Sequence, residues 1–382
     1  MTSHAVENHW DPRCAEVQKD QLAAYDNMRG TCPIAHSEYM NWSVFTHADV
    51  KRILRDHETF SSRVSNHLSV PNGMDPPEHE QFRAIIDKYF AASKMDRFEP
   101  VARSIAAELV ASLPTGQDIE VMEDIAQIFS LRCQSAFMGW PISLERPLLE
   151  WVRKNHAATL ECDPVKLEAV ACDFDHHIRN LLTECRGRPP EDITGQLLNE
   201  TVEGRPLSEE EIVSIIRNWT VGELSTIASS VGIVLKFLAE HSEVQDHLSG
   251  DYSQIDTATD EIQRIHDPLV TSRRVATKTG EISGQKFGAG TRFTIMWPSA
   301  NRDEAVFDDP DQFRLDRDHD ENFVYGAGIH ACPGATLARL ELRVLLEELF
   351  GSGARILSTP DKHRNAIYPA GGYSEIYIRM SR

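Results

Sequence analysis

The sequence predicts an α+β fold in which helices predominate and the strands form small, segregated β-sheets. Apolar residues recur at helical spacing along most of the chain, whereas strand-like segments are short and lie after residue 270. Helices and strands show no βαβ alternation, so a parallel α/β sheet is not expected. Neither a G-x-G-x-x-G after a strand nor a G-x-x-x-x-G-K-[ST] occurs, which leaves nucleotide-binding folds without support.

Composition narrows the class of protein. The 382 residues carry a net charge of −20, and this argues against nucleic acid as a partner because phosphate binding needs basic surface. No signal peptide is recognisable at the start, and no run of ~18 apolar residues predicts a membrane span. The seven cysteines are scattered and odd in number, without a CxxC pair. We therefore expect a cytoplasmic protein, with residues 1–382 forming one domain.

Helical periodicity is strongest in four segments, residues 122–140, 163–186, 208–241 and 257–268. Ser208 followed by Glu211 is a capping-box pattern and predicts where the third helix begins. That helix is unusually long, and its second half is largely apolar. We expect it to cross the molecule through the core.

Four shorter segments alternate or are rich in β-branched residues, and glycines lie in or between them. They are residues 273–279, 281–290, 291–298 and 373–379. These segments predict the small sheets of the fold.

One cysteine lies in an unusual loop, "FVYGAGIHACPG" at residues 323–334. The loop glycines permit positive φ and close approach of the backbone to a large, flat group. A helical pattern follows at once over 335–350, and a helix N-terminus lowers the pKa of a nearby thiol. A lone thiolate suits a single axial bond to a metal, whereas the alternative is an inert buried cysteine in a turn.

The segment "YGAGIHACPGATLARLE" resembles the haem-binding loop of the cytochrome P450 family, F-G-x-G-x-H-x-C-x-G followed by A-x-x-A-R-x-E. The residues in register are Gly326, Gly328, His330, Cys332, Gly334, Ala338, Arg339 and Glu341. Tyr325 stands where the family usually has Phe, which keeps the ring and adds a hydroxyl.

The resemblance implies a cytochrome P450 fold that binds haem b (iron protoporphyrin IX), with Cys332 as the metal ligand. Tyr325, Gly326 and Gly334 would contact the cofactor. Four further side chains match the positions that hold the haem propionates in the family: His79, Arg83, Arg274 and His330. Propionates need cationic or hydrogen-bond donor partners.

A second family motif, E-x-x-R, is matched by Glu261 and Arg264, which share one helix face. In the family this structural pair is completed by another arginine. Either Arg314 or Arg317 is the candidate here.

The family's oxygen-activation motif, [AG]-G-x-[DE]-T, aligns with "GELST" at residues 222–226. The resemblance gives catalytic roles to Thr226 at the alcohol position and Ser225 at the acid position. Glu223 replaces the second glycine and is the third catalytic candidate. Its carboxyl group either faces the distal pocket, as proton donor or substrate anchor, or faces away in a structural hydrogen bond.

Segments that line the substrate pocket in the family indicate mixed apolar and aromatic candidates. They are His67, Leu68, Val70, Trp219, Leu269, Val270, Gly372 and Tyr373.

The expected function is a haem-thiolate monooxygenase that uses O2 to hydroxylate or O/N-dealkylate a small hydrophobic substrate, aromatic ones included. Electrons would come from a ferredoxin or flavodoxin and its reductase, or from a fused reductase module. Arg339 and Arg343 are candidates for docking this donor. Two alternatives are a peroxide-driven enzyme that uses Glu223 in place of the usual acid, and a haem sensor that binds through Cys332–Pro333.

Overall fold

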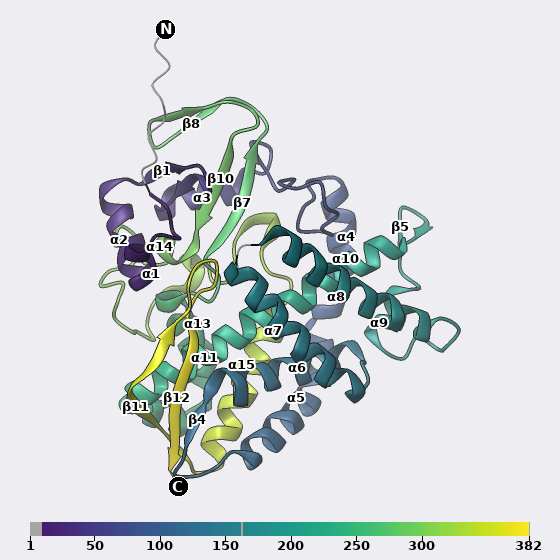
Figure 1. The fold of residues 1–382 in the computed structure, drawn as a ribbon, viewed down its shortest axis with the longest axis vertical. Coiled ribbons are helices and arrows are strands. Elements are labelled where there is room, and N and C mark those ends of the chain that lie inside the picture. Colours follow the sequence, from purple (N-terminus) through teal and green to yellow (C-terminus); the bar gives the residue numbers. More distant parts are fainter. Residues whose placement is uncertain (1–9, 162, 382) are drawn as a thin grey trace.

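The computed structural model describes residues 10–161 and 163–381 (Figure 1). A large helical region and a smaller strand-rich region lie side by side (Figure 1). This arrangement confirms the expected α+β class with small, separate sheets.

Helices make up most of the described chain. The α-helices are α1 (Ala15–Lys19), α2 (Gln21–Thr31), α3 (His47–Arg55), α4 (Glu78–Ile86), α5 (Ala92–Ser112), α6 (Gln127–Met138), α7 (Glu145–Glu161), α8 (Pro164–Cys185), α9 (Ile193–Leu197), α10 (Glu209–Val221), α11 (Ala228–Glu240), α12 (Ser242–Gly250), α13 (Ile255–His266), α14 (Trp297–Ala300) and α15 (Ala335–Gly351). Two π-helical segments are η2 (Met122–Ala126) and η4 (Gly222–Ile227), and η1 (Asp87–Phe90) is a 3-10 turn. All four segments with strong periodicity are helical.

The expected long helix consists of α10, η4 and α11 in direct succession. Its start is the predicted capping box: Ser208 Oγ accepts from the Glu211 amide, and the Glu211 carboxylate accepts from the Ser208 amide. Residues 209–240 are long and apolar enough to span a membrane by composition, but 72% of the most apolar window is buried within the protein. The helix therefore serves as the core helix of the fold.

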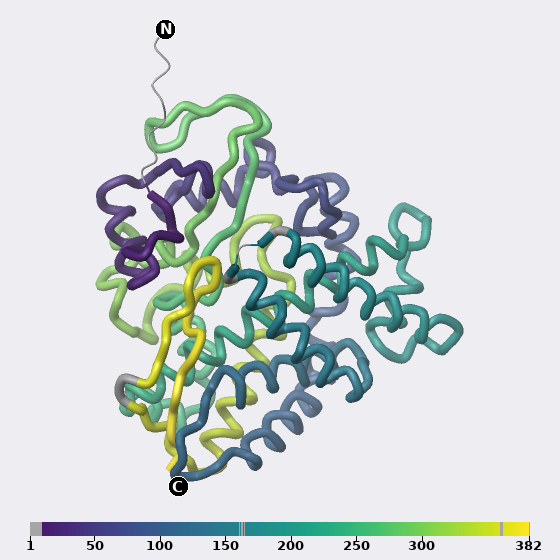
Figure 2. Tube along the Cα trace, in the orientation of Figure 1, coloured from purple at the N-terminus to yellow at the C-terminus, as the bar shows by residue number. Residues whose placement is uncertain are grey.

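Strands form two main sheets and two small hairpins. They are β1 (Ile34–Ser37), β2 (Asn41–Val44), β3 (Phe60–Ser61), β4 (Asp118–Glu120), β5 (Thr201–Val202), β6 (Arg205–Pro206), β7 (Thr271–Ala276), β8 (Gly280–Ile282), β9 (Gln285–Phe287), β10 (Arg292–Met296), β11 (Arg355–Asn365) and β12 (Tyr373–Ser381). The larger sheet has the order β1-β2-β10-β7-β3, with only the β2–β10 pair parallel. In the second sheet, β12 pairs with β11 and with β4 from far earlier in the chain (Figure 2).

The main core surrounds the long helix. Nearly every side chain of α11 is buried, and α15 packs along α5. A second apolar cluster lies under the larger sheet and includes Phe60, Phe293 and Phe323. Phe323 belongs to the loop that carries the cysteine, so the packing of the sheet helps to fix the site.

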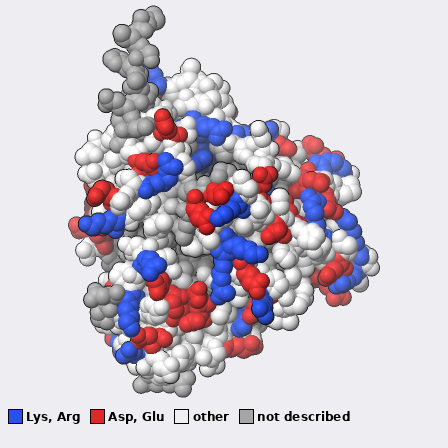
Figure 3. Space-filling model, in the orientation of Figure 1, with Lys and Arg blue, Asp and Glu red and all other residues white. Residues whose placement is uncertain are grey.

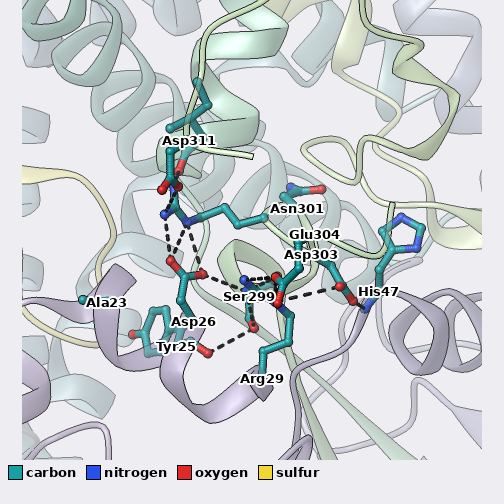
Figure 4. Close-up of polar contacts among 12 residues, drawn as sticks. Ala23, Tyr25, Asp26, Arg29, His47, Ser299, Asn301, Asp303, Glu304 and Asp311 are labelled. Atoms are coloured by element: carbon teal, nitrogen blue, oxygen red, sulfur yellow. Dashed lines mark hydrogen bonds and ion pairs between the residues drawn. The ribbon is translucent and has the colours of Figure 1, made fainter. Parts of the chain in front are cut away.

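An ion-pair network joins the N-terminal helix α2 to the segment after α14 (Figure 4). Arg29 bonds Asp26, the Ser299 carbonyl and Glu304, with Nη distances of 2.7–2.9 Å. Arg302 bridges Asp26 and Asp311. Because several charges share partners here, the network positions α2 more firmly than isolated surface pairs would.

Candidate active site

The cysteine loop is held in shape by its own backbone and by close packing. The Cys332 amide donates to the Tyr325 carbonyl at 2.8 Å. Gly326 and Gly328 both have φ of +70°, a conformation that favours glycine. A Cβ on Gly328 would lie 2.3 Å from the Leu54 carbonyl oxygen, so glycine is also required there for space.

Cys332 is exposed to solvent, but protein atoms surround its thiol on most sides. Burial raises the thiol pKa and outweighs the opposing influence of the Gly334 amide and of the positive charges on Arg83 and Arg339. The sequence-based expectation of a lowered pKa at the start of α15 is therefore wrong for the free thiol, because desolvation exceeds the helix effect. A bound metal cation would supply the missing charge, since coordination deprotonates a thiol.

Two histidine rings meet beside this loop with unsatisfied nitrogens. His79 of α4 and His330 pack edge to face with centroids 4.4 Å apart. Both His79 nitrogens and His330 Nε2 are buried without a hydrogen-bond partner among the described residues. Burial lowers the pKa of both histidines, that of His330 to about 3, so both rings are neutral at pH 7. The sequence had left open whether the partners of the propionates are cations or hydrogen-bond donors, and the two histidines are donors.

Two arginines complete the predicted propionate set. Burial lowers the pKa of Arg274 to about 10, which leaves it charged at pH 7. Among the described residues its guanidinium donates hydrogen bonds to Ser272 Oγ and the Arg273 carbonyl, and no carboxylate pairs with it. Arg83 donates to the Ala331 carbonyl at 2.6 Å and thereby ties α4 to the cysteine loop. The structure thus brings together all four predicted side chains.

These residues fit haem. A dianionic ligand would satisfy the unpaired imidazole nitrogens and the buried Arg274 charge, and unpaired buried polar groups are costly without such a partner. Among the described residues there is no group of three or more His, Cys, Asp or Glu side chains that could hold a metal ion on its own. A single thiol as the only protein ligand agrees with iron that the porphyrin already coordinates.

The E-x-x-R pair forms as predicted and is fully buried. Arg264 Nε and Nη2 donate to the two Glu261 oxygens at 2.8 and 3.0 Å. Arg317 Nε donates to Glu261 Oε1 at 2.9 Å, whereas the Arg314 side chain pairs with exposed Asp316. The structure decides the open choice in favour of Arg317.

The predicted oxygen-activation motif coincides with the π-helical segment η4. Ser225 and Gly222 are exposed, Thr226 is half-buried, and Ser225 Oγ donates to the Val221 carbonyl at 2.6 Å. π-segments inside helices frequently mark functional sites. The spacing of apolar residues does not reveal a π-helical segment, because a π-turn differs from an α-turn by only one additional residue.

Glu223 does not lie in an open pocket. Its side chain is buried and faces Glu341 of α15, the last residue of the A-x-x-A-R-x-E motif. The structure therefore supports neither a contact with substrate nor a position in the distal pocket. Neither Glu341 oxygen has a hydrogen-bond partner of normal geometry among the described residues, although the two carboxyl groups are close enough to perturb each other.

The predicted substrate residues divide into two groups. His67, Leu68 and Leu269 are exposed. The loop that carries His67 and Leu68 is anchored to α10, where Ser214 Oγ donates to the Leu68 carbonyl and accepts from the Val70 amide. Val70 and Val270 are buried in core clusters, so the prediction that they line an open pocket is not supported.

The two aromatic candidates also make packing contacts. Trp219 packs on Tyr89 and Phe90 of η1. Tyr373 lies edge-on against His363, and Gly372 packs close to Ile233. Val221 of α10 is 41% exposed. It was not predicted as a candidate for the substrate pocket, because its position in the helical pattern resembles that of a core residue.

The basic residues predicted to dock a redox protein are engaged within the chain. Arg339 pairs with Asp260 and stacks over the Tyr325 ring at 4.5 Å. Arg343 joins Glu99, Asp256 and Glu347. Acidic and basic groups alternate over the face in Figure 3, without one dominant basic patch.

Comparison with known proteins supports the haem interpretation. The family model described as "Cytochrome P450" matches residues 255–351, from α13 to the end of α15. Erythromycin C-12 hydroxylase of Saccharopolyspora erythraea is 29% identical over 362 residues, which cover 90% of this chain and 91% of that protein. Cytochrome P450 109 of Bacillus spizizenii is 28% identical over 351 residues, covering 89% and 86%.

Solved structures agree with this result. A mutant of P450 EryK in complex with erythromycin B superposes with a TM-score of 0.87 at 26% identity, covering 95% of this chain and 97% of that one. A P450 of Bacillus megaterium in complex with corticosterone gives a TM-score of 0.84 at 27% identity, covering 95% and 99%.

Proposed function

Because this chain belongs to the cytochrome P450 family and is a monooxygenase, we propose that it oxidises a small hydrophobic substrate with electrons from separate redox proteins. The reaction takes R–H, O2, two electrons and two protons to R–OH and water. Dealkylation follows when the hydroxylated carbon carries oxygen or nitrogen. Haem b, when bound, supplies the activation of O2 and the oxidising power.

One observation carries the assignment of the haem site: unpaired His79 and His330 nitrogens lie beside buried Arg274, next to the loop that presents Cys332. Here the protein's residues bind and orient. Cys332 would hold the iron, and a thiolate ligand favours cleavage of the O–O bond. His79, His330 and Arg274 would hold the propionates and thereby orient the cofactor.

The proposed role of Thr226 is to hold water and a proton at its hydroxyl on the accessible face of η4, with Ser225 at the neighbouring position. The Ser225 hydroxyl donates its proton to the Val221 carbonyl, so it can act toward water only as an acceptor, through its lone pairs. A carboxylic acid is missing from this face, since Glu223 is turned into the core. Proton transfer would therefore rely on hydroxyl groups and water.

The first experiment is a screen of ligand-induced Soret shifts across small aromatics, terpenes and fatty acids. A ligand that displaces a distal water shifts the band, and product formation is then measured with a surrogate ferredoxin or flavodoxin and its reductase. We expect turnover with the reconstituted electron supply. Substitution of exposed Leu68 or Leu269 by Phe should change the affinity of the bound ligand at least several-fold, whereas no change in both variants would place the substrate elsewhere.

The peroxide-driven alternative is tested in the same assay by omitting the reductase and adding hydrogen peroxide. The position of Glu223 in the core does not favour it, because a residue that acts on peroxide must reach the distal face. Product formed at equal rates with peroxide alone would contradict the proposed dependence on redox proteins. A haem sensor has no need of the buried Glu261–Arg264–Arg317 cluster or of the propionate set.

A further inference from the structure

Two acidic side chains face each other in the core behind the predicted oxygen-activation segment. Glu223 of η4 is 6% exposed, and Glu341 of α15 is fully buried. No Lys, Arg or His in the described part of the chain forms an ion pair with either carboxyl group. Two ionised carboxylates cannot persist side by side in such a place, because both burial and mutual repulsion oppose the second charge.

The charged and titratable neighbours of this pair are few. Burial raises the pKa of Glu223 to about 7 and that of Glu341 well above its usual range. Cys133 of α6 is fully buried beside both, and burial together with their negative charges raises its pKa too. Charge on Glu223 also raises the pKa of Cys332, so the pair and the predicted iron ligand interact through space.

Water has access to the segment that carries Glu223. Gly222 and Ser225 of η4 are exposed, and nothing lies within 4 Å of where a Gly222 Cβ would be. The pair is thus buried but close to a solvated helix face, which allows protons to exchange with bulk water.

We propose that Glu223 and Glu341 form a proton-sharing pair that takes up one proton from solvent when the site gains one electron. The pair holds two protons at low pH and one when ionised, with the remaining proton on one of the two carboxyl groups. An electron arriving from a one-electron donor adds negative charge near Cys332. The ionised carboxylate then binds one proton, one O–H bond forms, and the net charge of the region is unchanged. This inference rests on the proposed function, since it requires haem bound at Cys332.

The test is a potentiometric titration of the haem-loaded protein across pH, with dithionite as reductant and absorbance as the readout. The reduction equilibrium constant should be independent of pH below about 6 and should fall by up to tenfold per pH unit above about 7. Glu223→Gln keeps the size of the side chain but cannot ionise, and it should flatten the profile. Glu341→Gln leaves Glu223 beside an amide and should move the pH at which the slope begins.

The control is Glu243→Gln, which removes the same charge from an exposed position on α12 and should keep the wild-type profile. A flat wild-type profile, or a slope that persists unchanged in both Glu223→Gln and Glu341→Gln, would overturn the proton-sharing pair. Loss of the haem-thiolate carbon monoxide spectrum in the wild type would instead overturn the proposed function. The two failures are therefore distinguishable.

Discussion

The imidazole rings of His79 and His330 lie edge to face, 4.4 Å apart between centroids, although they come from helix α4 and from the cysteine loop. Neither ring is charged at pH 7, and their three buried, unpaired nitrogens leave hydrogen-bonding capacity unused. Polar groups in this state indicate a missing partner, since burial without a hydrogen bond costs about 1–3 kcal/mol for each group. Haem propionates supply that partner.

Arg274→Ala should weaken haem binding about 10- to 100-fold, because a hydrogen bond to a charged group is worth about 1.5–3 kcal/mol. The measurement is the haem content retained after gel filtration and the rate of haem transfer to a haem-binding acceptor. Arg273→Ala is the matched control, since Arg273 is the exposed neighbour on the same strand. Equal haem retention in the two variants would remove Arg274 from the propionate set.

Arg317→Ala should destabilise the fold by about 1.5–3 kcal/mol, because the buried Glu261 carboxylate loses one charge-assisted hydrogen bond while its pair with Arg264 remains. Arg314→Ala should cost no more than about 0.5 kcal/mol, since its side chain makes only an exposed pair with Asp316. Denaturant unfolding of both variants gives the comparison. Equal losses of stability would contradict the assignment of Arg317 as the third member of the cluster.

Gly328→Ala should destabilise the cysteine loop more than Gly326→Ala. Both positions have φ of +70°, but only at Gly328 would the new Cβ meet a backbone oxygen, at 2.3 Å, while the nearest atom at Gly326 is 3.7 Å away. Backbone strain alone is worth about 1–2 kcal/mol, so the excess in Gly328→Ala reports the clash. Thermal unfolding with haem content as a second readout measures both effects, and equal behaviour would mean that α3 moves to make room.

The buried carboxyl pair should make stability depend on pH. Glu223 has its pKa raised from 4.5 to about 7, so between these values the folded protein holds a proton that the unfolded chain has released. Stability therefore falls as pH rises through this window. Glu223→Gln should remove the contribution of Glu223 to this dependence, while that of buried Glu341 remains, and at pH 8 it should gain on the order of 3 kcal/mol relative to the wild type.

Urea unfolding followed by far-ultraviolet circular dichroism at pH 5, 6, 7 and 8 checks the carboxyl pair. Glu243→Gln serves as the control here too. A parallel pH dependence in wild type and Glu223→Gln would show that Glu223 is ionised in the folded state without cost.

The sequence predicted the parts of the site that lie close together along the chain. The spacing around Cys332 and the i, i+3 pair Glu261–Arg264 were sufficient, because local backbone geometry alone places these residues. Contacts between distant segments were less accessible. The choice of Arg317 over Arg314 depends on how the 308–320 segment folds against α13, and nothing in the residue types distinguishes the two.

The direction of Glu223 is the clearest case of a tertiary effect. The sequence left open whether Glu223 faces the distal pocket or faces away from it. In the π-segment η4 its side chain is buried and lies near Glu341 of α15. Strands β1, β2, β4 and β11 escaped prediction for a related reason, since pairing with distant segments stabilises them more than their own residues do.

The bond from Cys332 to haem iron is the central claim, and the carbon monoxide spectrum of the reduced, haem-loaded protein tests it most directly. The account predicts the long-wavelength Soret band of a thiolate-ligated haem in the wild type and its loss in Cys332→Ala. A folded wild-type protein that lacks this band, or a Cys332→Ala variant that keeps it, would contradict the account.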